Sequence, residues 1–202
     1  VVTENKTEAA RLYALAAKNQ NANQGAAVLL LSILYEEMGE YEKAFSNADF
    51  YRSQDMFEGY VRCSDLYRNG IGVEKNEAKA DEYLKIACEP RFAKEQMTTG
   101  LLYSRGKGVK RDKAKAFYWT EIAAKNGSPQ GQANLCGYYI DGYGCEADIE
   151  KAEEFGLKSA EQGNDHGMFS LAKVYKKKKD PANEFKYIEM AAKLGNEKAL
   201  VE

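Results

Sequence analysis

Small and bulky residues recur along this chain with a period of 36 residues, marked by a repeated tyrosine. The repeated tyrosines are Tyr67, Tyr103, Tyr139 and Tyr175, and Tyr35 precedes the first of them by 32 residues. The third residue before each tyrosine is small, and the residue directly before it is bulky and apolar. Offsets of one, three and four residues lie on one face of a helix. The pattern therefore predicts a repeated helix, named helix A, whose small residue admits a second helix closely.

A second stripe follows each tyrosine and predicts a partner helix, named helix B. Its recurring alanines are Ala44, Ala80, Ala116 and Ala152. An aromatic residue follows three positions later in most units, as Tyr83, Trp119 and Phe155, with Tyr187 in the last unit. Polar residues that we predict as N-caps precede the stripe: Asn76, Asp112, Asp148 and Asp180. A fixed period of this length indicates a repeat architecture.

The connecting stretch "YRNGIGVEKNEAKA", residues 67–80, contains two glycines and looks like half of a phosphate-binding loop. It lacks the Gly-Lys-Ser/Thr ending of such loops, and it follows a helical pattern rather than a strand. We predict instead that the first glycine of each loop ends helix A with a positive φ, which glycine adopts without steric cost. These glycines are Gly70, Gly106 and Gly142. The second glycine of each pair gives a second turn, and the first and last units have a shorter loop.

The repeats account for residues 1–202 as a single array. We expect an opening helix at about residues 3–19, then five helix pairs, then the start of a further helix at residues 196–202. The predicted units are residues 24–55, 56–91, 92–127, 128–163 and 164–195.

Composition narrows the classes of function. With 44% apolar and 30% charged residues, the 202-residue chain has the composition of a folded protein. Its net charge of −2 argues against a nucleic-acid partner. The longest apolar run, residues 25–35, is too short to span a bilayer. No signal peptide is evident, although Val1 is not an initiator methionine, so the N-terminus does not fix the localisation.

The stretch "TTGLLYSRGKGVKRDKAKAFYWTEIAAKNG", residues 98–127, combines Leu-Tyr, Gly-x-Gly-Val, Asp, Lys-Ala, an aromatic residue and Ala-Ala. In this order the motifs resemble the Sel-one-like repeat family, relatives of the tetratricopeptide repeats, over roughly residues 8–202. The resemblance implies an all-α fold, a right-handed α-solenoid of antiparallel helix pairs with a 36-residue period, and a bacterial source. It says little about function, because such repeats are scaffolds for many different partners.

Four cysteines and one histidine raise the question of a disulfide, metal or catalytic site. In the resembled family, a cysteine-rich branch carries a disulfide in each repeat, and hydrolase activity has been proposed for it. Here Cys63, Cys88, Cys136 and Cys145 stand where other repeats place core residues, so we predict buried free thiols. Without a CxxC motif, and with His166 alone in a turn-like stretch, the sequence predicts no metal, no cofactor and no catalytic residue. Unpaired thiols slightly favour the cytoplasm, and periplasmic or secreted locations stay open.

By resemblance to tetratricopeptide repeats, partner-binding positions lie on helix A, six and two residues before the repeated tyrosine and one and two after it. We predict that these residues line a concave face and bind a protein or peptide. They are Leu29, Ile33, Glu36, Glu37, Asp65, Arg68, Met97, Leu101, Arg105, Phe169, Lys173 and Lys176. The apolar members allow two interpretations, a hydrophobic binding strip or packing against the neighbouring repeat. The charged members change from acidic to basic along the chain, which would orient a partner of opposite polarity.

The leading functional prediction is a non-enzymatic adaptor that binds a protein or peptide partner. One alternative is a structural spacer within a larger multidomain protein. Another is a hydrolase of the cysteine-rich type, which the missing cysteine framework and the single histidine oppose. The lysine run at residues 176–179 is interpreted as a solvated loop, with a patch for an acidic partner as the alternative. No motif encodes the oligomeric state, and a monomer is expected.

Overall fold

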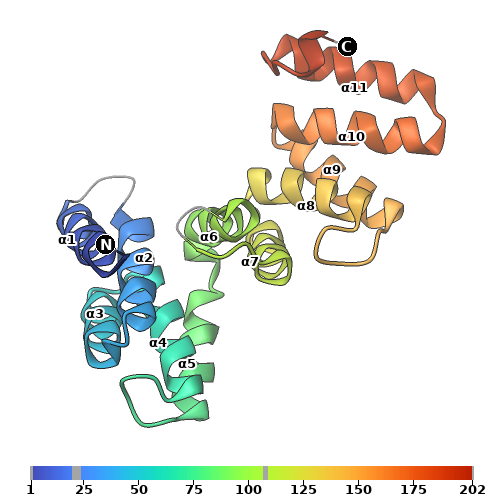
Figure 1. Cartoon of the computed structure of the whole chain (residues 1–202). Helices are drawn as coiled ribbons and strands as arrows, with labels where there is room; N and C mark the ends of the chain where they lie inside the picture. Colours follow the sequence, from blue (N-terminus) through green and yellow to red (C-terminus); the bar gives the residue numbers. More distant parts are fainter. Residues whose placement is uncertain (1, 20–23, 107–108, 202) are drawn as a thin grey trace. The chain divides into compact units, whose positions relative to one another are not determined.

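The computed structural model describes residues 2–19, 24–106 and 109–201. These ranges form eleven α-helices and two short 3-10 helices, and they contain no strand (Figure 1). The α-helices are α1 Val2–Lys18, α2 Gln24–Glu37, α3 Tyr41–Ser53, α4 Phe57–Asn69, α5 Glu77–Ala87, α6 Ala93–Arg105, α7 Lys113–Lys125, α8 Pro129–Asp141, α9 Ile149–Glu161, α10 Asp165–Lys178 and α11 Pro181–Lys193. The 3-10 helices are η1 Pro90–Phe92 and η2 Ala199–Val201. The predicted all-α class is confirmed.

The chain divides into two compact units, Val1–Glu95 (unit 1) and Gln96–Glu202 (unit 2). Within unit 1, the consecutive helices α1 to α5 each pack against the next. Within unit 2, α7 to α11 do the same. The predicted A helices correspond to α2, α4, α6, α8 and α10, and the B helices to α3, α5, α7, α9 and α11. Where the sequence predicts a further helix A, the chain forms η2.

Each helix pair is closed by the same backbone hydrogen bond. The carbonyl of the repeated tyrosine accepts it from the amide of the residue that precedes the following helix. These bonds join Glu40 to Tyr35 at 2.9 Å, Asn76 to Tyr67 at 2.9 Å, Asp112 to Tyr103 at 3.1 Å, Asp148 to Tyr139 at 2.9 Å and Asp180 to Tyr175 at 2.9 Å. The short and long loops share this bond, so both reverse the chain at the same point of helix A.

The predicted N-caps are confirmed. The side chains of Asn76, Asp112 and Asp148 each accept a hydrogen bond at 3.0 Å from the backbone amide three residues later. Asp180 accepts the same bond at 3.1 Å from the amide of Asn183. Each cap satisfies a backbone donor that the first turn of a helix leaves without an intrahelical partner.

The small residue before each tyrosine lets helix A approach helix B. In the first pair, Ser32 Oγ donates to the carbonyl of Ala44 at 3.0 Å. In the third pair the small residue is Gly100, and a Cβ built there would lie 2.5 Å from Thr120 Oγ1. Thr120 on helix B thus fills the space beside Gly100 on helix A. A larger residue at one of these positions therefore requires a smaller residue at the other.

The first glycine of each loop has the predicted left-handed conformation. Gly70 and Gly142 end α4 and α8 with φ of 67° and 65°. Gly106 takes φ of 67° after α6. In the short loop after α10, Lys179 takes this conformation, with φ of 58°.

Replacing Gly106 by valine is expected to lower the free energy of unfolding by about 1 kcal/mol or more, because a β-branched residue is strained at positive φ. Thermal unfolding followed by circular dichroism measures the loss. Gly137→Ala is the control, because Gly137 lies within α8 and a Cβ there meets no atom within 4 Å. An unchanged Tm for Gly106→Val would contradict the loop geometry.

Candidate functional site

The accessible face of the A helices in unit 2 contains polar side chains, one leucine and one glycine at helical spacing. All of its residues are exposed or half-buried. They are Thr98, Leu101 and Arg105 on α6, Gln130, Asn134 and Gly137 on α8, and His166, Ser170 and Lys173 on α10. We name this set the unit 2 face.

The predicted apolar residues six positions before the tyrosine lie in the core. Leu29, Met97 and Phe169 are 1%, 7% and 7% exposed. This burial favours the second interpretation of these residues, packing against neighbouring helices. Ile33 and Leu101, two positions before the tyrosine, are half-buried.

Sequence reasoning missed the position five before the tyrosine. One residue along a helix turns the side chain by about 100°, so this position and the one six before it point in different directions. The residues at this position are Leu30, Arg62, Thr98, Asn134 and Ser170. Four of these five are polar, whereas the residues six before the tyrosine are all apolar. In unit 2, that contrast is the sequence signal that indicates the accessible side of helix A, whereas in unit 1 Arg62 at this position is buried.

In unit 1, Arg62 organises the corresponding face. Its side chain is only 5% exposed. Its guanidinium donates to Glu36 Oε2 at 2.6 Å and to Ser32 Oγ at 3.2 Å. Asp65 lies 3.7 Å from the same group. One buried cation therefore holds two partly exposed carboxylates between α2 and α4.

The other charged residues predicted in unit 1 also have partners within that unit. Glu37 pairs with Lys6 at 3.1 Å, and Arg68 pairs with Asp81 at 2.7 Å. These are exposed pairs, which contribute little to stability. The structure thus brings Glu36 and Asp65 together on Arg62, and it places Glu37 and Arg68 in separate ion pairs. The charge change along the whole chain stays a prediction.

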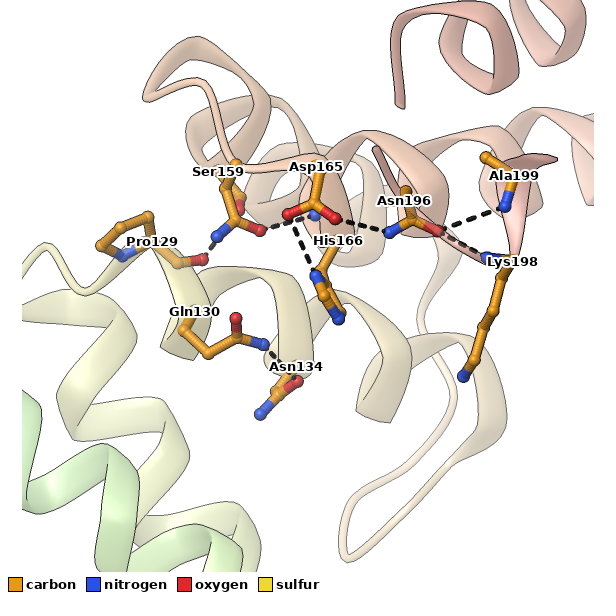
Figure 2. Close-up of polar contacts among 11 residues, drawn as sticks. Pro129, Gln130, Asn134, Ser159, Asp165, His166, Asn196, Lys198 and Ala199 are labelled. Carbon is orange, nitrogen blue, oxygen red and sulfur yellow. Dashed lines mark hydrogen bonds and ion pairs between the residues drawn. The ribbon is translucent and has the colours of Figure 1, made fainter. Parts of the chain in front are cut away.

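The amide side chains on α8 form the centre of the unit 2 face. Gln130 Nε2 donates to Asn134 Oδ1 at 3.2 Å (Figure 2). Asn134 Nδ2 in turn lies 3.7 Å from Met97 Sδ, which ties the face to α6. On α10, the ammonium of Lys173 lies 4.7 Å from the centre of the Phe169 ring. The buried apolar residues therefore support the polar side chains that reach the surface.

The lysine run at residues 176–179 is largely exposed, as predicted, but most of it is helical rather than a loop. Its first three residues belong to the last turn of α10. Lys177 Nζ donates to the carbonyl of Ile140 at 2.9 Å, at the end of α8. Lys178 pairs with Glu150 at 2.9 Å and also with Glu153. The predicted binding residue Lys176 lies 3.6 Å from Glu184. Lys176, Lys177 and Lys178 therefore each contact a polar group of the same protein.

Asp165 and His166 lie at the start of α10, where Figure 2 shows their contacts. Asp165 is 3.1 Å from His166 Nδ1 and accepts from Asn196 Nδ2 at 2.8 Å. Burial acts to raise the pKa of Asp165, but the hydrogen bonds with His166 and Asn196 lower it overall. Asn196 also accepts from the backbone amides of Lys198 and Ala199 at 3.2 Å. These contacts connect α10 to η2, and the His166 side chain is 63% exposed, as expected for a solvated histidine.

Sel1 repeats match this chain in five stretches: residues 2–21, 58–89, 99–128, 129–164 and 178–196. The chain belongs to the Sel1 repeat family. This Sel1 repeat protein is similar to a crystal structure of a Sel1 repeat protein from Oxalobacter formigenes, with 24% identity and a TM-score of 0.52. That alignment covers 89% of this chain and 76% of the other.

A second similar structure is that of c5321, a protective antigen present in uropathogenic Escherichia coli strains displaying an SLR fold. It is 22% identical with a TM-score of 0.55 and covers 96% of this chain, which spans 47% of that protein. At these identities the likeness shows the fold alone, and it confirms the predicted α-solenoid class. No curated protein matches this chain.

The four cysteines of this Sel1 repeat protein differ in burial. Cys63 and Cys136 are fully buried, and burial raises the pKa of both thiols to about 12. Cys88 and Cys145 are only partly buried, contrary to the prediction, because Cys88 caps the end of α5 and Cys145 lies in the loop between α8 and α9. None of these four cysteines, all of which lie in the described ranges, forms a disulfide bond. Within residues 2–19, 24–106 and 109–201, no three acidic, histidine or cysteine side chains gather as metal ligands. No helix in those ranges is long and apolar enough to cross a membrane.

Proposed function

We propose that this Sel1 repeat protein is a non-enzymatic scaffold that binds a protein or peptide partner through the unit 2 face. One observation carries the proposal. In the A helices of unit 2, polar residues recur at the accessible position, as Thr98, Asn134 and Ser170, although the adjacent position is apolar and buried in each. A surface kept polar and half-exposed over a well-packed apolar layer is suited to reversible protein contact.

The chemistry of the face fits a peptide segment. The amides of Gln130 and Asn134 each offer a donor and an acceptor, which a peptide backbone can use. Leu101 adds an apolar contact, and Lys173 adds a cation. At Gly137 a Cβ would meet no atom within 4 Å, so a partner side chain has room between these residues.

The buried thiols and the exposed His166 argue against the hydrolase alternative. Both fully buried cysteines have pKa values raised to about 12, so they are protonated at neutral pH and poor nucleophiles. Repeat scaffolds of this type bind partners on extended surfaces rather than performing catalysis.

The test compares two double variants of the full chain with the wild type as baits in lysate from the source cells. The face variant is Leu101→Glu/Lys173→Glu. The control is Phe185→Glu/Lys186→Glu on α11, which makes the same kinds of change at exposed positions outside the face. A photo-reactive amino acid that replaces Asn134 crosslinks to any protein in direct contact with the unit 2 face and so identifies it.

We expect a partner that the wild type and the control retain, that crosslinks at position 134, and that the folded face variant loses by at least about tenfold. A partner that the face variant retains as well as the wild type would contradict the proposal. So would crosslinks that form at Tyr118 on α7 but not at position 134.

A further inference from the structure

Four cations lie within six residues at the entrance to α7. Lys110, Arg111, Lys113 and Lys115 are all exposed. In the described part of the chain, none of the four forms an ion pair with an acidic side chain. The intervening Asp112 uses its carboxylate to cap α7 through the amide of Lys115. We name these four residues the basic patch.

The fold does not require this charge. The residues 36 positions earlier are Glu74, Lys75, Glu77 and Lys79, and those 36 positions later are Glu146, Ala147, Ile149 and Lys151. Each of those two sets is neutral overall, yet both span the start of a helix B with the same N-cap geometry. In the sibling loops, Lys75 pairs with Glu77 and Lys151 pairs with Asp148. The positive charge of the patch therefore has a cause other than folding.

Tyr143, from the next loop of unit 2, holds part of the patch in place. Arg111 Nε donates to the Tyr143 hydroxyl at 3.2 Å, and that hydroxyl donates to the carbonyl of Ser104 at 3.3 Å. The Tyr143 ring lies 5.6 Å from the Arg111 guanidinium and 5.3 Å from the Lys113 ammonium. Such contacts orient cations without neutralising them. Lys115 lies in the same way 5.2 Å from the ring of Tyr103.

We propose that the basic patch, whose residues are distinct from those of the unit 2 face, binds an acidic segment of a protein partner. Oriented, unpaired cations attract carboxylates and accelerate association. A short acidic segment fits better than a nucleic acid because the patch is small. Two exposed acids flank Tyr143 in the sequence: Asp141 ends α8, and Glu146 lies in the loop that contributes Tyr143. Both would repel a polyanion that runs past the patch.

The test measures binding of a fluorescent peptide of alternating glutamate and glycine to the full chain by anisotropy, at low and at physiological salt. The patch variant is Lys110→Glu/Lys113→Glu, which introduces the residues found at the sibling positions Glu74 and Glu77 and so should fold. The control is Lys186→Glu/Lys198→Glu, which changes the net charge equally at exposed lysines elsewhere in unit 2. An oligothymidylate of matched length tests the nucleic-acid alternative.

We expect the wild type and the control to bind the acidic peptide alike, and the patch variant to bind about tenfold more weakly, with affinity falling as salt is raised. Three results would overturn the proposal. They are no binding of the acidic peptide at low salt, equal losses in the patch and control variants, and tighter binding of oligothymidylate than of the peptide.

Discussion

Replacing Gly144 by alanine is expected to lower the free energy of unfolding by about 3 kcal/mol, from strain and overpacking together. Gly144 is the second glycine of its loop and has φ of 75°. A Cβ at this position would lie 2.3 Å from the carbonyl oxygen of Lys113 and 2.9 Å from the Cβ of Phe117. Both belong to the preceding helix B, so the alanine would force apart two successive repeats of unit 2. Chemical denaturation followed by circular dichroism measures the loss.

Gly142→Ala is the matched control for this prediction. Gly142 also has a positive φ, of 65°, but the nearest atom to a Cβ there is 3.4 Å away. Its replacement removes the conformational freedom without the clash, so we expect a loss of only about 1 kcal/mol. The same contrast holds in unit 1, where a Cβ at Gly72 would lie 2.0 Å from the carbonyl oxygen of Tyr41. Equal losses for Gly142→Ala and Gly144→Ala would show that close packing is not the role of the second glycine.

Replacing Glu58 by glutamine is expected to stabilise the protein at pH 8 by up to about 3 kcal/mol and to have little effect near pH 4. Glu58 lies in the first turn of α4 and is 7% exposed. A Cβ at Gly25 would lie 2.0 Å from its Oε1, so the carboxylate is packed against the backbone of α2. Burial is the main cause that raises the pKa of Glu58, to about 7, and the nearby charge of Glu95 adds to it.

The direction in which stability changes with pH follows from proton binding to Glu58. The pKa of Glu58 in the folded protein is above its ordinary value of 4.5, so between those pH values the folded state binds more protons than the unfolded state. The contribution of Glu58 to stability therefore falls as the pH rises from about 4.5 to about 7, and it is constant above that range. Glutamine has no charge to desolvate, so the free energy of unfolding of the Glu58→Gln variant lacks this decline.

Urea denaturation of the wild type and Glu58→Gln between pH 4 and pH 8 tests this expectation. The difference between the two isolates Glu58, because other titrating groups contribute equally to both. Glu82→Gln, at an exposed position on α5, is the control and should give a constant difference near zero. A difference between wild type and Glu58→Gln that stays flat with pH would mean that Glu58 is solvated or paired.

The sequence by itself determined the local structure of this protein. N-caps such as Asp112 and left-handed glycines such as Gly142 act within a few residues of the chain, so their signals survive in a single sequence. The regular spacing of the tyrosines and alanines in the sequence then located the helix pairs and the buried alanines, because equivalent residues of successive repeats pack in equivalent places. The resemblance to the Sel1 repeat family rested on the same residues.

The tertiary structure alone decided which charges are paired, and it oriented each A helix about its axis where the polarity of the sequence left this open. The orientation of a helix about its axis depends on the helices packed against it. The structure places Leu29 and Met97 in the core, which was one of the two interpretations that the sequence left open. The burial of Arg62 and Glu58, and the contact of Gly144 with the preceding helix B, depend on residues about 30 positions away. Local pattern carries no information about such neighbours, because burial and electrostatics are set by the assembled helices rather than by the chain.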